Sequence, residues 1–147
     1  MATRSPQGKT SDSIILYDGV CGLCNKFNLF VLRRDEHNLF RFASLQSRFA
    51  KEVLARHGAS PEKLDTVYLI ADYGQAAETV LSRSEAVIFV LAHLASTTRV
   101  ARVLQLLPKL LVDGIYDFIA GTRYRLFGRL KQCPLPNDDQ RKKFIEV

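Results

Sequence analysis

The sequence lacks an apolar run long enough to cross a bilayer, which needs roughly 20 apolar residues in succession. Its longest apolar runs, residues 86–94 and 103–112, are interrupted by His93 and Pro108. Residues 1–12 are polar and lack the apolar stretch of a secretory signal. We therefore expect a disordered leader over these residues and a soluble protein of the cytoplasm.

Cysteine is scarce as well, since the 147 residues contain three. Cys21 and Cys24 are three residues apart, and Cys133 follows more than a hundred residues later. An odd count with this spacing excludes the multiple-disulfide framework of small secreted domains. Without a secretory signal, a close pair of cysteines indicates catalysis or metal binding instead.

Patterns typical of nucleic-acid binding are missing too, although the formal net charge is +6 and the pI is about 9.4. The sequence has no helix-turn-helix spacing, no paired zinc ligands and no strand that interleaves aromatic and basic residues. Arginine and lysine are spread over several segments, which is typical of solvated faces. We expect neither a nucleic-acid partner nor a transmembrane segment.

What the sequence does contain suits one globular α/β domain, with 47% hydrophobic and 24% charged residues. Short β-branched and aromatic runs predict strands at residues 13–17, 39–43, 66–71 and 78–81. Helical spacing predicts helices at 21–34, 48–57, 84–95 (with Ser84 as N-cap), 98–107 and 109–130. This order predicts a thioredoxin-like fold: a glutaredoxin-like β-α-β-α-β-β-α core at 13–96, a helical C-terminal extension of the same domain at 97–131, and a tail at 132–147.

A Cys-x-x-C motif stands between the first predicted strand and helix, in the sequence Asp18-Gly19-Val20-Cys21-Gly22-Leu23-Cys24. The N–H groups and dipole at a helix N-terminus stabilise negative charge, so we expect a modestly lowered pKa for an exposed, nucleophilic Cys21. Cys24 lies one turn later on the same face and can reach it. The spacing predicts that Cys21 attacks a substrate disulfide and that a shielded Cys24 resolves the mixed disulfide.

Other interpretations of the motif remain open, although redox chemistry is favoured. A Cys-x-x-C pair is also half of many zinc and iron-sulfur sites, for which Cys133 is the one further thiol. A structural role in the core suits Cys24 alone better than both cysteines. Asp18, three residues before Cys21, either caps the helix with its side chain or accepts the proton that Cys24 must lose.

Further segments accompany the motif: Tyr17 before it, Asp35 after it, and residues 42–47, 84–87, 116–120 and 123–125. Together they resemble the DCC family of predicted thiol-disulfide oxidoreductases, which is named after its Asp-Cys-Cys pattern. The resemblance implies a thioredoxin-like fold and an oxidoreductase role carried by Cys21 and Cys24, with Asp18 as the third residue of the motif. Asp35 is expected to be a structural partner of a neighbouring arginine or backbone group.

Thioredoxins proper usually place a cis-proline before the strand near Val67, facing the redox pair. Here Asp65 and Thr66 occupy that region. The missing proline puts the usual docking of a substrate backbone in question, and it keeps the metal interpretation open.

The last predicted helix carries an aromatic and basic mixture: Tyr116, Ile119, Arg123, Tyr124, Arg125, Phe127 and Arg129. We expect this helix to pack across the core and to show its arginines to water. The alternative is a docking surface for a partner or for an anionic membrane.

We therefore predict an enzyme, a thiol-disulfide oxidoreductase that exchanges a Cys21/Cys24 dithiol or disulfide with thiol or disulfide substrates, chiefly proteins, without a cofactor. One alternative is a metal- or iron-sulfur-binding protein that uses the same cysteines and Cys133. Another is a non-enzymatic interaction module that works through the basic helix, with Arg123 and Arg125. Cys133 itself is either a surface thiol or a third redox participant.

Overall fold

The structure is a computed structural model that describes residues 13–19, 21–35, 39–59, 67–128 and 143–145, with the backbone alone for residues 95, 123, 124 and 127. Its elements are β1 (Ser13–Tyr17), α1 (Gly22–Arg34), β2 (Phe40–Ser44), α2 (Arg48–Arg56), β3 (Tyr68–Ala71), β4 (Thr79–Ser82), α3 (Arg83–Ala92), η1 (Ala95–Thr97), α4 (Thr98–Leu106), α5 (Lys109–Phe127) and β5 (Phe144–Ile145). The predicted leader and Cys133 lie outside the described residues.

The described strands form one sheet in the order β4-β3-β1-β2-β5. β1 pairs in parallel with β2, which α1 connects to it, and antiparallel with β3. β3 in turn pairs antiparallel with β4. The predicted β-α-β-α-β-β-α order and the thioredoxin-like fold are confirmed.

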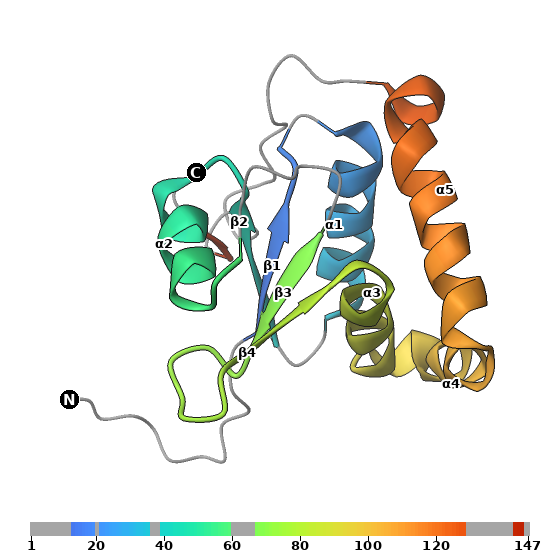
Figure 1. Cartoon of the computed structure of the whole chain (residues 1–147). Coiled ribbons are helices and arrows are strands. Elements are labelled where there is room, and N and C mark those ends of the chain that lie inside the picture. Colours follow the sequence, from blue (N-terminus) through green and yellow to red (C-terminus); the bar gives the residue numbers. More distant parts are fainter. Residues whose placement is uncertain (1–12, 20, 36–38, 60–66, 129–142, 146–147) are drawn as a thin grey trace.

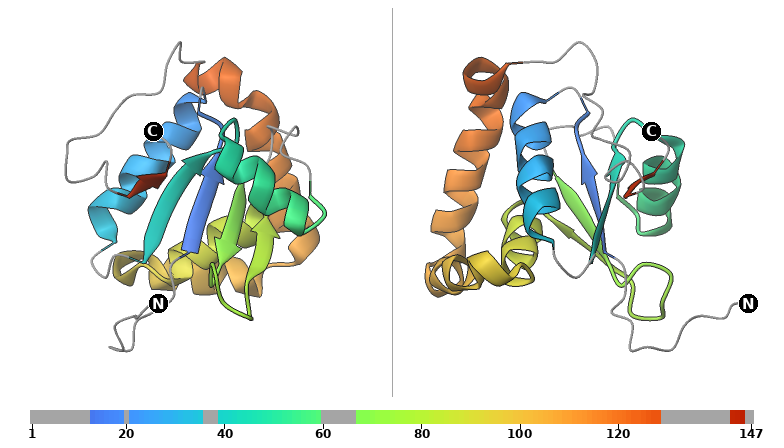
Figure 2. Two further views of the ribbon diagram at one scale, coloured as in Figure 1. Left: turned by 90° about the vertical axis from the view of Figure 1, so that its left-hand side faces the viewer. Right: turned by 180° about the vertical axis from the view of Figure 1, so that it is seen from behind.

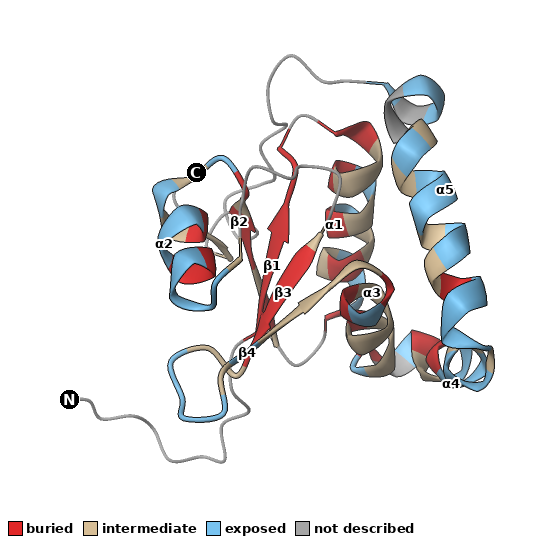
Figure 3. Ribbon diagram, viewed as in Figure 1, coloured by how far each residue is buried: buried red, intermediate tan, exposed pale blue. Residues whose placement is uncertain are grey.

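The helices cover both faces of this sheet. α2 lies on one face, α1 and α3 lie on the other, and α4 and α5 form an outer layer beyond them (Figure 1 and Figure 2). Side chains of β1 alternate between the two faces, so that Ile14 and Leu16 pack with Leu54 of α2 while Ile15 packs with Val31 of α1. Every residue of β1 is buried, as expected for a central strand that helices cover on both sides (Figure 3).

α3 begins at Arg83 with Ser82 as its N-cap, so the predicted N-cap at Ser84 is wrong. Ser84 is buried in the first turn, and its hydroxyl donates a hydrogen bond to Asp113 of α5. The hydroxyl therefore fastens α5 to α3 instead of satisfying the first N–H groups of its own helix.

β5 adds an edge to the sheet that the sequence analysis did not predict, within the segment that it described as a tail. This strand pairs in parallel with β2. Phe144 stacks on Phe42 with ring centroids 4.9 Å apart. The end of the chain thereby contributes to the core on the α1 side of the sheet.

Asp35 follows the last residue of α1 and is buried. Its two carboxylate oxygens accept hydrogen bonds from the N–H groups of Leu39 and Phe40, each at 2.9 Å. Lys143 Nζ lies 3.4 Å from Oδ2. The prediction that Asp35 is a structural partner of backbone groups is confirmed.

In the part of the chain that the structure describes, no helix combines the length and the apolar content needed to cross a membrane.

Candidate active site

Cys21 occupies the N-terminus of α1, where the sequence placed it. It is the N-cap residue, and its Sγ accepts a hydrogen bond from the Cys24 N–H at 3.2 Å. The first turn of α1 contains no acidic residue. The N–H group and the helix dipole therefore both favour negative charge on this sulfur.

The exposure of the two thiols is the reverse of the expectation. Cys21 is 0% exposed, whereas Cys24 is only partly buried, and both are thiols rather than a disulfide. The chain after α5 returns to this loop, where the Gly22 N–H donates to the Gly128 carbonyl at 3.2 Å. The predictions of an exposed Cys21 and a shielded Cys24 are therefore wrong.

Asp18 lies at the end of β1 and is 1% exposed. Its Oδ1 accepts a hydrogen bond from Gln46 Nε2 at 3.0 Å, and its backbone carbonyl accepts one from the Cys21 N–H at 3.1 Å. Because Cys21 is the N-cap, the interpretation of Asp18 as the capping side chain is wrong. Asp18 is instead a buried carboxylate in the loop that carries the dithiol.

Gln46 holds this loop against the end of β2. Its Oε1 accepts hydrogen bonds from the Gly19 N–H, at 3.2 Å, and from the Ser44 hydroxyl. A Cβ at Gly19 would lie 3.2 Å from Ser44 Oγ and 3.3 Å from Gln46 Oε1. A side chain at Gly19 would therefore require Ser44 or Gln46 to shift by a few tenths of an ångström.

Gln46 was not predicted as a site residue, although its position after β2 carries a signal. Consecutive parallel strands such as β1 and β2 end at the same edge of a sheet. A polar residue two positions after β2 could thus have been placed beside the loop that follows β1.

Two asparagines line the buried side of α1 after Cys21. Asn25 Nδ2 donates to the carbonyls of Gly19, at 3.2 Å, and Cys21, at 2.9 Å, which fixes the turn before the helix. Asn28 is 2% exposed, and its Oδ1 and Nδ2 have no hydrogen-bond partner among the described residues. Such a group costs about 1 to 3 kcal/mol of stability.

The metal interpretation requires further ligands beside the dithiol. Within the described ranges, no three His, Cys, Asp or Glu side chains are grouped so that they could hold a metal ion. Cys133, which that interpretation would add, lies outside them.

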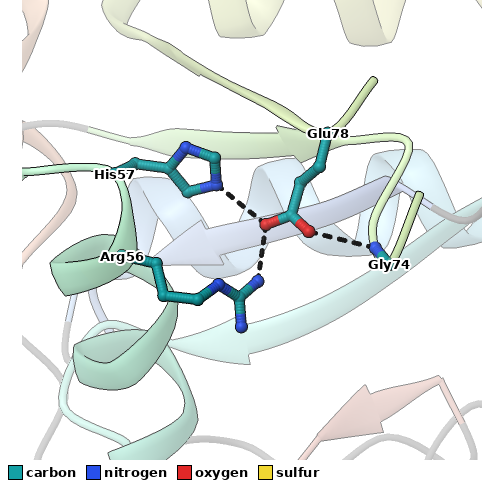
Figure 4. A network of polar contacts seen from close by, with 4 residues as sticks. All are labelled: Arg56, His57, Gly74 and Glu78. Atoms are coloured by element: carbon teal, nitrogen blue, oxygen red, sulfur yellow. Dashed lines mark hydrogen bonds and ion pairs between the residues drawn. The ribbon is translucent and has the colours of Figure 1, made fainter. Parts of the chain in front are cut away.

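A second polar cluster lies at the end of the sheet away from the start of α1, between α2 and the β3–β4 turn (Figure 4). Glu78 Oε2 accepts hydrogen bonds from Arg56 at 2.6 Å and from His57 at 2.8 Å. Its Oε1 accepts one from the Gly74 N–H at 3.1 Å. Burial alone would raise the pKa of Glu78, but these hydrogen bonds outweigh it and lower the pKa from 4.5 to about 2. We call Arg56, His57, Gly74 and Glu78 the clasp, because their contacts tie the end of α2 to the β3–β4 turn.

Known proteins resemble this chain over most of its length. A family model described as DCC1-like thiol-disulfide oxidoreductase matches residues 15–129. The chain is 36% identical over 132 residues to the uncharacterized protein YuxK of Bacillus subtilis (strain 168), covering 90% of this chain and 93% of that protein. It is 34% identical over 123 residues to a chloroplastic DCC family protein of Arabidopsis thaliana, covering 83% of this chain and 69% of the relative. No solved structure matches the chain.

Proposed function

The chain belongs to the DCC1-like thiol-disulfide oxidoreductase family, and we propose that Cys21 and Cys24 are its redox-active pair. The observation that carries the proposal is the hydrogen bond from the Cys24 N–H to Cys21 Sγ at the helix N-cap. A sulfur in this position is stabilised as a thiolate, which is the nucleophile of disulfide exchange.

The proposed reaction has two steps. The Cys21 thiolate attacks a substrate disulfide, so that a mixed disulfide forms while the second substrate sulfur leaves as a thiolate and takes a proton from solvent. Cys24 then loses its proton and attacks Cys21 Sγ. This closes the intramolecular disulfide and releases the substrate sulfur that was bonded to Cys21 as a thiol. The substrate gains two electrons and the dithiol loses them. The reverse sequence transfers the disulfide to a substrate dithiol.

Asp18 is proposed as the group that accepts the Cys24 proton in the second step. It is buried in the same loop, and the hydrogen bond from Gln46 Nε2 holds its carboxylate. Gln46 is then a positioning residue, since it acts through Asp18 and Gly19.

Burial of Cys21 implies that the first step needs a local opening. The contact between Gly22 and Gly128 is the described backbone bond that joins the start of α1 to the end of α5. We propose that this contact loosens during the opening, since it joins α1 to the end of α5 and includes no strand of the sheet. The roles of the two thiols then follow from electrostatics, while the rate of attack follows from access.

The experiment is to trap the mixed disulfide with each single variant in cells. Cys24→Ser should accumulate covalent, reductant-sensitive adducts, because attack by Cys21 is intact and resolution is blocked. Cys21→Ser and the double variant should accumulate few. Mass spectrometry of the adducts would identify the substrate.

Three results would contradict the proposal. Adducts that gather on Cys21→Ser instead would mean that exposure outweighs thiolate stabilisation and that Cys24 attacks first. Equal trapping by both variants would mean that neither thiol is specially activated. The third result is evidence for metal binding by the cysteines. It would be one bound zinc or an iron-sulfur absorbance band per chain, or an absence of trapping together with thiols that titrate near the ordinary value of about 8.5.

The substrates proposed are thiols or disulfides, chiefly of proteins, in the reducing environment of the cytoplasm. The family relationship supports the class of substrate.

A further inference from the structure

α4 and α5 expose more large apolar side chains than the rest of the described chain. Apart from Leu29 of α1, every exposed large hydrophobic side chain among the described residues belongs to these two helices. We call this set the outer apolar face: Val100, Val103, Leu106, Leu110, Leu111, Ile115, Phe118, Ile119 and Leu126. Leu106 is 84% exposed and Leu110 88% exposed. Scattered exposed residues are ordinary, but a concentration of this kind marks an interaction surface.

The helical period sets most of this face apart from the side that holds the helices to the core, and Ile119, seven residues after the buried Val112, lies at the border between the two. In α5, Val112 is buried and Tyr116, four residues later, is partly buried. Phe118 is 69% exposed on the opposite side. Ala101 plays the inner role in α4. Both helices form the outermost layer of the molecule, and exposed residues dominate them (Figure 3).

The positive and the negative side chains of α4 and α5 differ in whether they have partners. Within the described chain, exposed Arg99, Arg102 and Arg125 have no ion pair. Arg99 lies four residues before Val103, and Arg125 lies seven residues after Phe118, so both cations share the sides that carry the apolar residues.

The carboxylates of α5 are engaged with the neighbouring elements instead. Asp113 accepts a hydrogen bond from Ser84, and Asp117 pairs with Arg83. The sequence of α4 contains no acidic residue. The outer apolar face is therefore bordered by cations that no carboxylate neutralises.

We propose that the outer apolar face docks peripherally onto an anionic lipid bilayer. Apolar side chains bordered by arginines are the composition of helices that lie in the membrane interface, where hydrophobic burial and attraction to anionic lipids add. A second copy of this chain fits less well. A two-fold interface would bring the outer face against itself and would set its unpaired arginines close to one another.

This docking would also orient the dithiol. The C-terminal end of α5 meets the start of α1 through the bond between Gly22 and Gly128, so the redox pair lies at one end of the docked helix (Figure 1). The proposal does not depend on the redox chemistry, since its observations come from α4 and α5 alone.

The test is flotation of the full chain with vesicles of phosphatidylcholine containing about one third phosphatidylglycerol, compared with phosphatidylcholine alone. We expect binding to the anionic vesicles that weakens as salt rises. Leu110→Ser should weaken binding about tenfold or more. Leu29→Ser is the matched control, because it makes the same chemical change at the exposed leucine outside the face, and it should leave binding unchanged.

A second pair of variants tests the charges. Joint substitution of Arg99, Arg102 and Arg125 by Gln should weaken binding about a hundredfold. The control replaces exposed Arg33, Arg48 and Lys51 of α1 and α2 by Gln. It removes the same total charge and should have a small effect.

Several outcomes would overturn the proposal. Equal loss in the two triple variants would mean diffuse adsorption of a basic protein, and equal binding to both vesicle types would mean that anionic lipid is not recognised. No vesicle binding would reject the bilayer outright. If sedimentation velocity then shows a dimer that Leu110→Ser abolishes, the face belongs to a second copy. If it shows a monomer, the face has no lipid role.

Discussion

α2 and α5 are both attached to the thioredoxin-like core, but by different forces. α2 buries Ala50, Val53 and Leu54 against the sheet. In the described part of α5, Val112 is the one buried large apolar side chain. Burial holds α2 because water is excluded from a continuous apolar face, whereas α5 turns most of its apolar residues outward.

Polar contacts anchor α5 instead. Tyr116 Oη accepts a hydrogen bond at 2.9 Å from the N–H of Val67, the residue before β3. Asp113 accepts one from Ser84, and Asp117 pairs with Arg83. Directional contacts of this kind fix the orientation of a helix at modest energetic gain. The difference teaches that the hydrophobic content of a helix does not reveal which of its sides the core uses.

The largest change in the free energy of unfolding is expected at Leu54 of α2, and the same substitution at Leu106 of α4 serves as the comparison. Leu54→Ala should lower the free energy of unfolding by about 2 to 4 kcal/mol, because it leaves a cavity between α2 and the sheet. Leu106→Ala in α4 should change it by less than about 0.5 kcal/mol, since Leu106 is exposed. Urea denaturation would measure both values. A comparable loss at Leu106 would show that α4 is covered in solution.

The clasp at the end of α2 should add a pH-dependent contribution. The pKa of Glu78 is lower in the folded protein, so its stabilisation is complete above about pH 5 and is lost as pH falls from 4.5 towards 2. The shift sets a limit of about 3 kcal/mol. Because the Arg56 side chain is 53% exposed, solvent screening reduces the expected contribution to about 1 to 2 kcal/mol.

Glu78→Gln should therefore destabilise the protein at pH 7 and flatten the decline of stability in acid. Urea denaturation at a series of pH values gives the measurement. Glu52→Gln is the control, because Glu52 is an exposed carboxylate of α2, the helix whose end Glu78 binds, and lies outside the clasp. If the two variants have the same pH slope, the clasp does not contribute to folding.

The anchor of α5 should have a smaller effect. Tyr116→Phe keeps the ring and removes the oxygen that accepts the Val67 N–H, at a cost of about 1 kcal/mol. Hydrogen exchange would localise the change, because the Val67 amide should lose protection while the Leu69 amide of the central sheet keeps it. Unchanged protection of the Val67 amide would show that this hydrogen bond does not anchor α5.

The sheet and the first helix were predictable because their signals are local. The apolar run at residues 13–17 ends at Asp18-Gly19 and matches β1. The Cys-x-x-C motif then falls at the start of α1, so the position of Cys21 followed from the order of strand, turn and helix.

The features that sequence reasoning missed depend on contacts between distant segments. Cys21 is 0% exposed, and the next residue, Gly22, bonds to the returning chain at Gly128; no pattern around the motif encodes that contact. β5 has two residues and is too short to produce a periodic signal. Ser84 looked like an N-cap because it precedes an apolar helix, but its hydroxyl is used by Asp113.

The smallest change in stability is expected for alanine substitutions at two glycines, one in α5 and one just after α2. Gly121, inside α5, and Gly58, just after α2, both have no atom within 4 Å of an added Cβ. Space is therefore equal at the two positions, and only the backbone differs. Gly58 has a φ of +72°, a backbone conformation that residues with a side chain rarely adopt. Gly121 lies within a helix, where alanine is favoured over glycine.

Gly121→Ala should raise the free energy of unfolding by about 0.5 to 1 kcal/mol, because alanine has less conformational freedom to lose on folding. Gly58→Ala should lower it by about 1 kcal/mol, because the left-handed conformation becomes strained. Thermal unfolding of both variants gives opposite shifts in Tm if α5 is a continuous helix in solution. If Gly121→Ala has no effect, the polar anchors do not hold α5 in a folded state, and the outer apolar face would lose its scaffold.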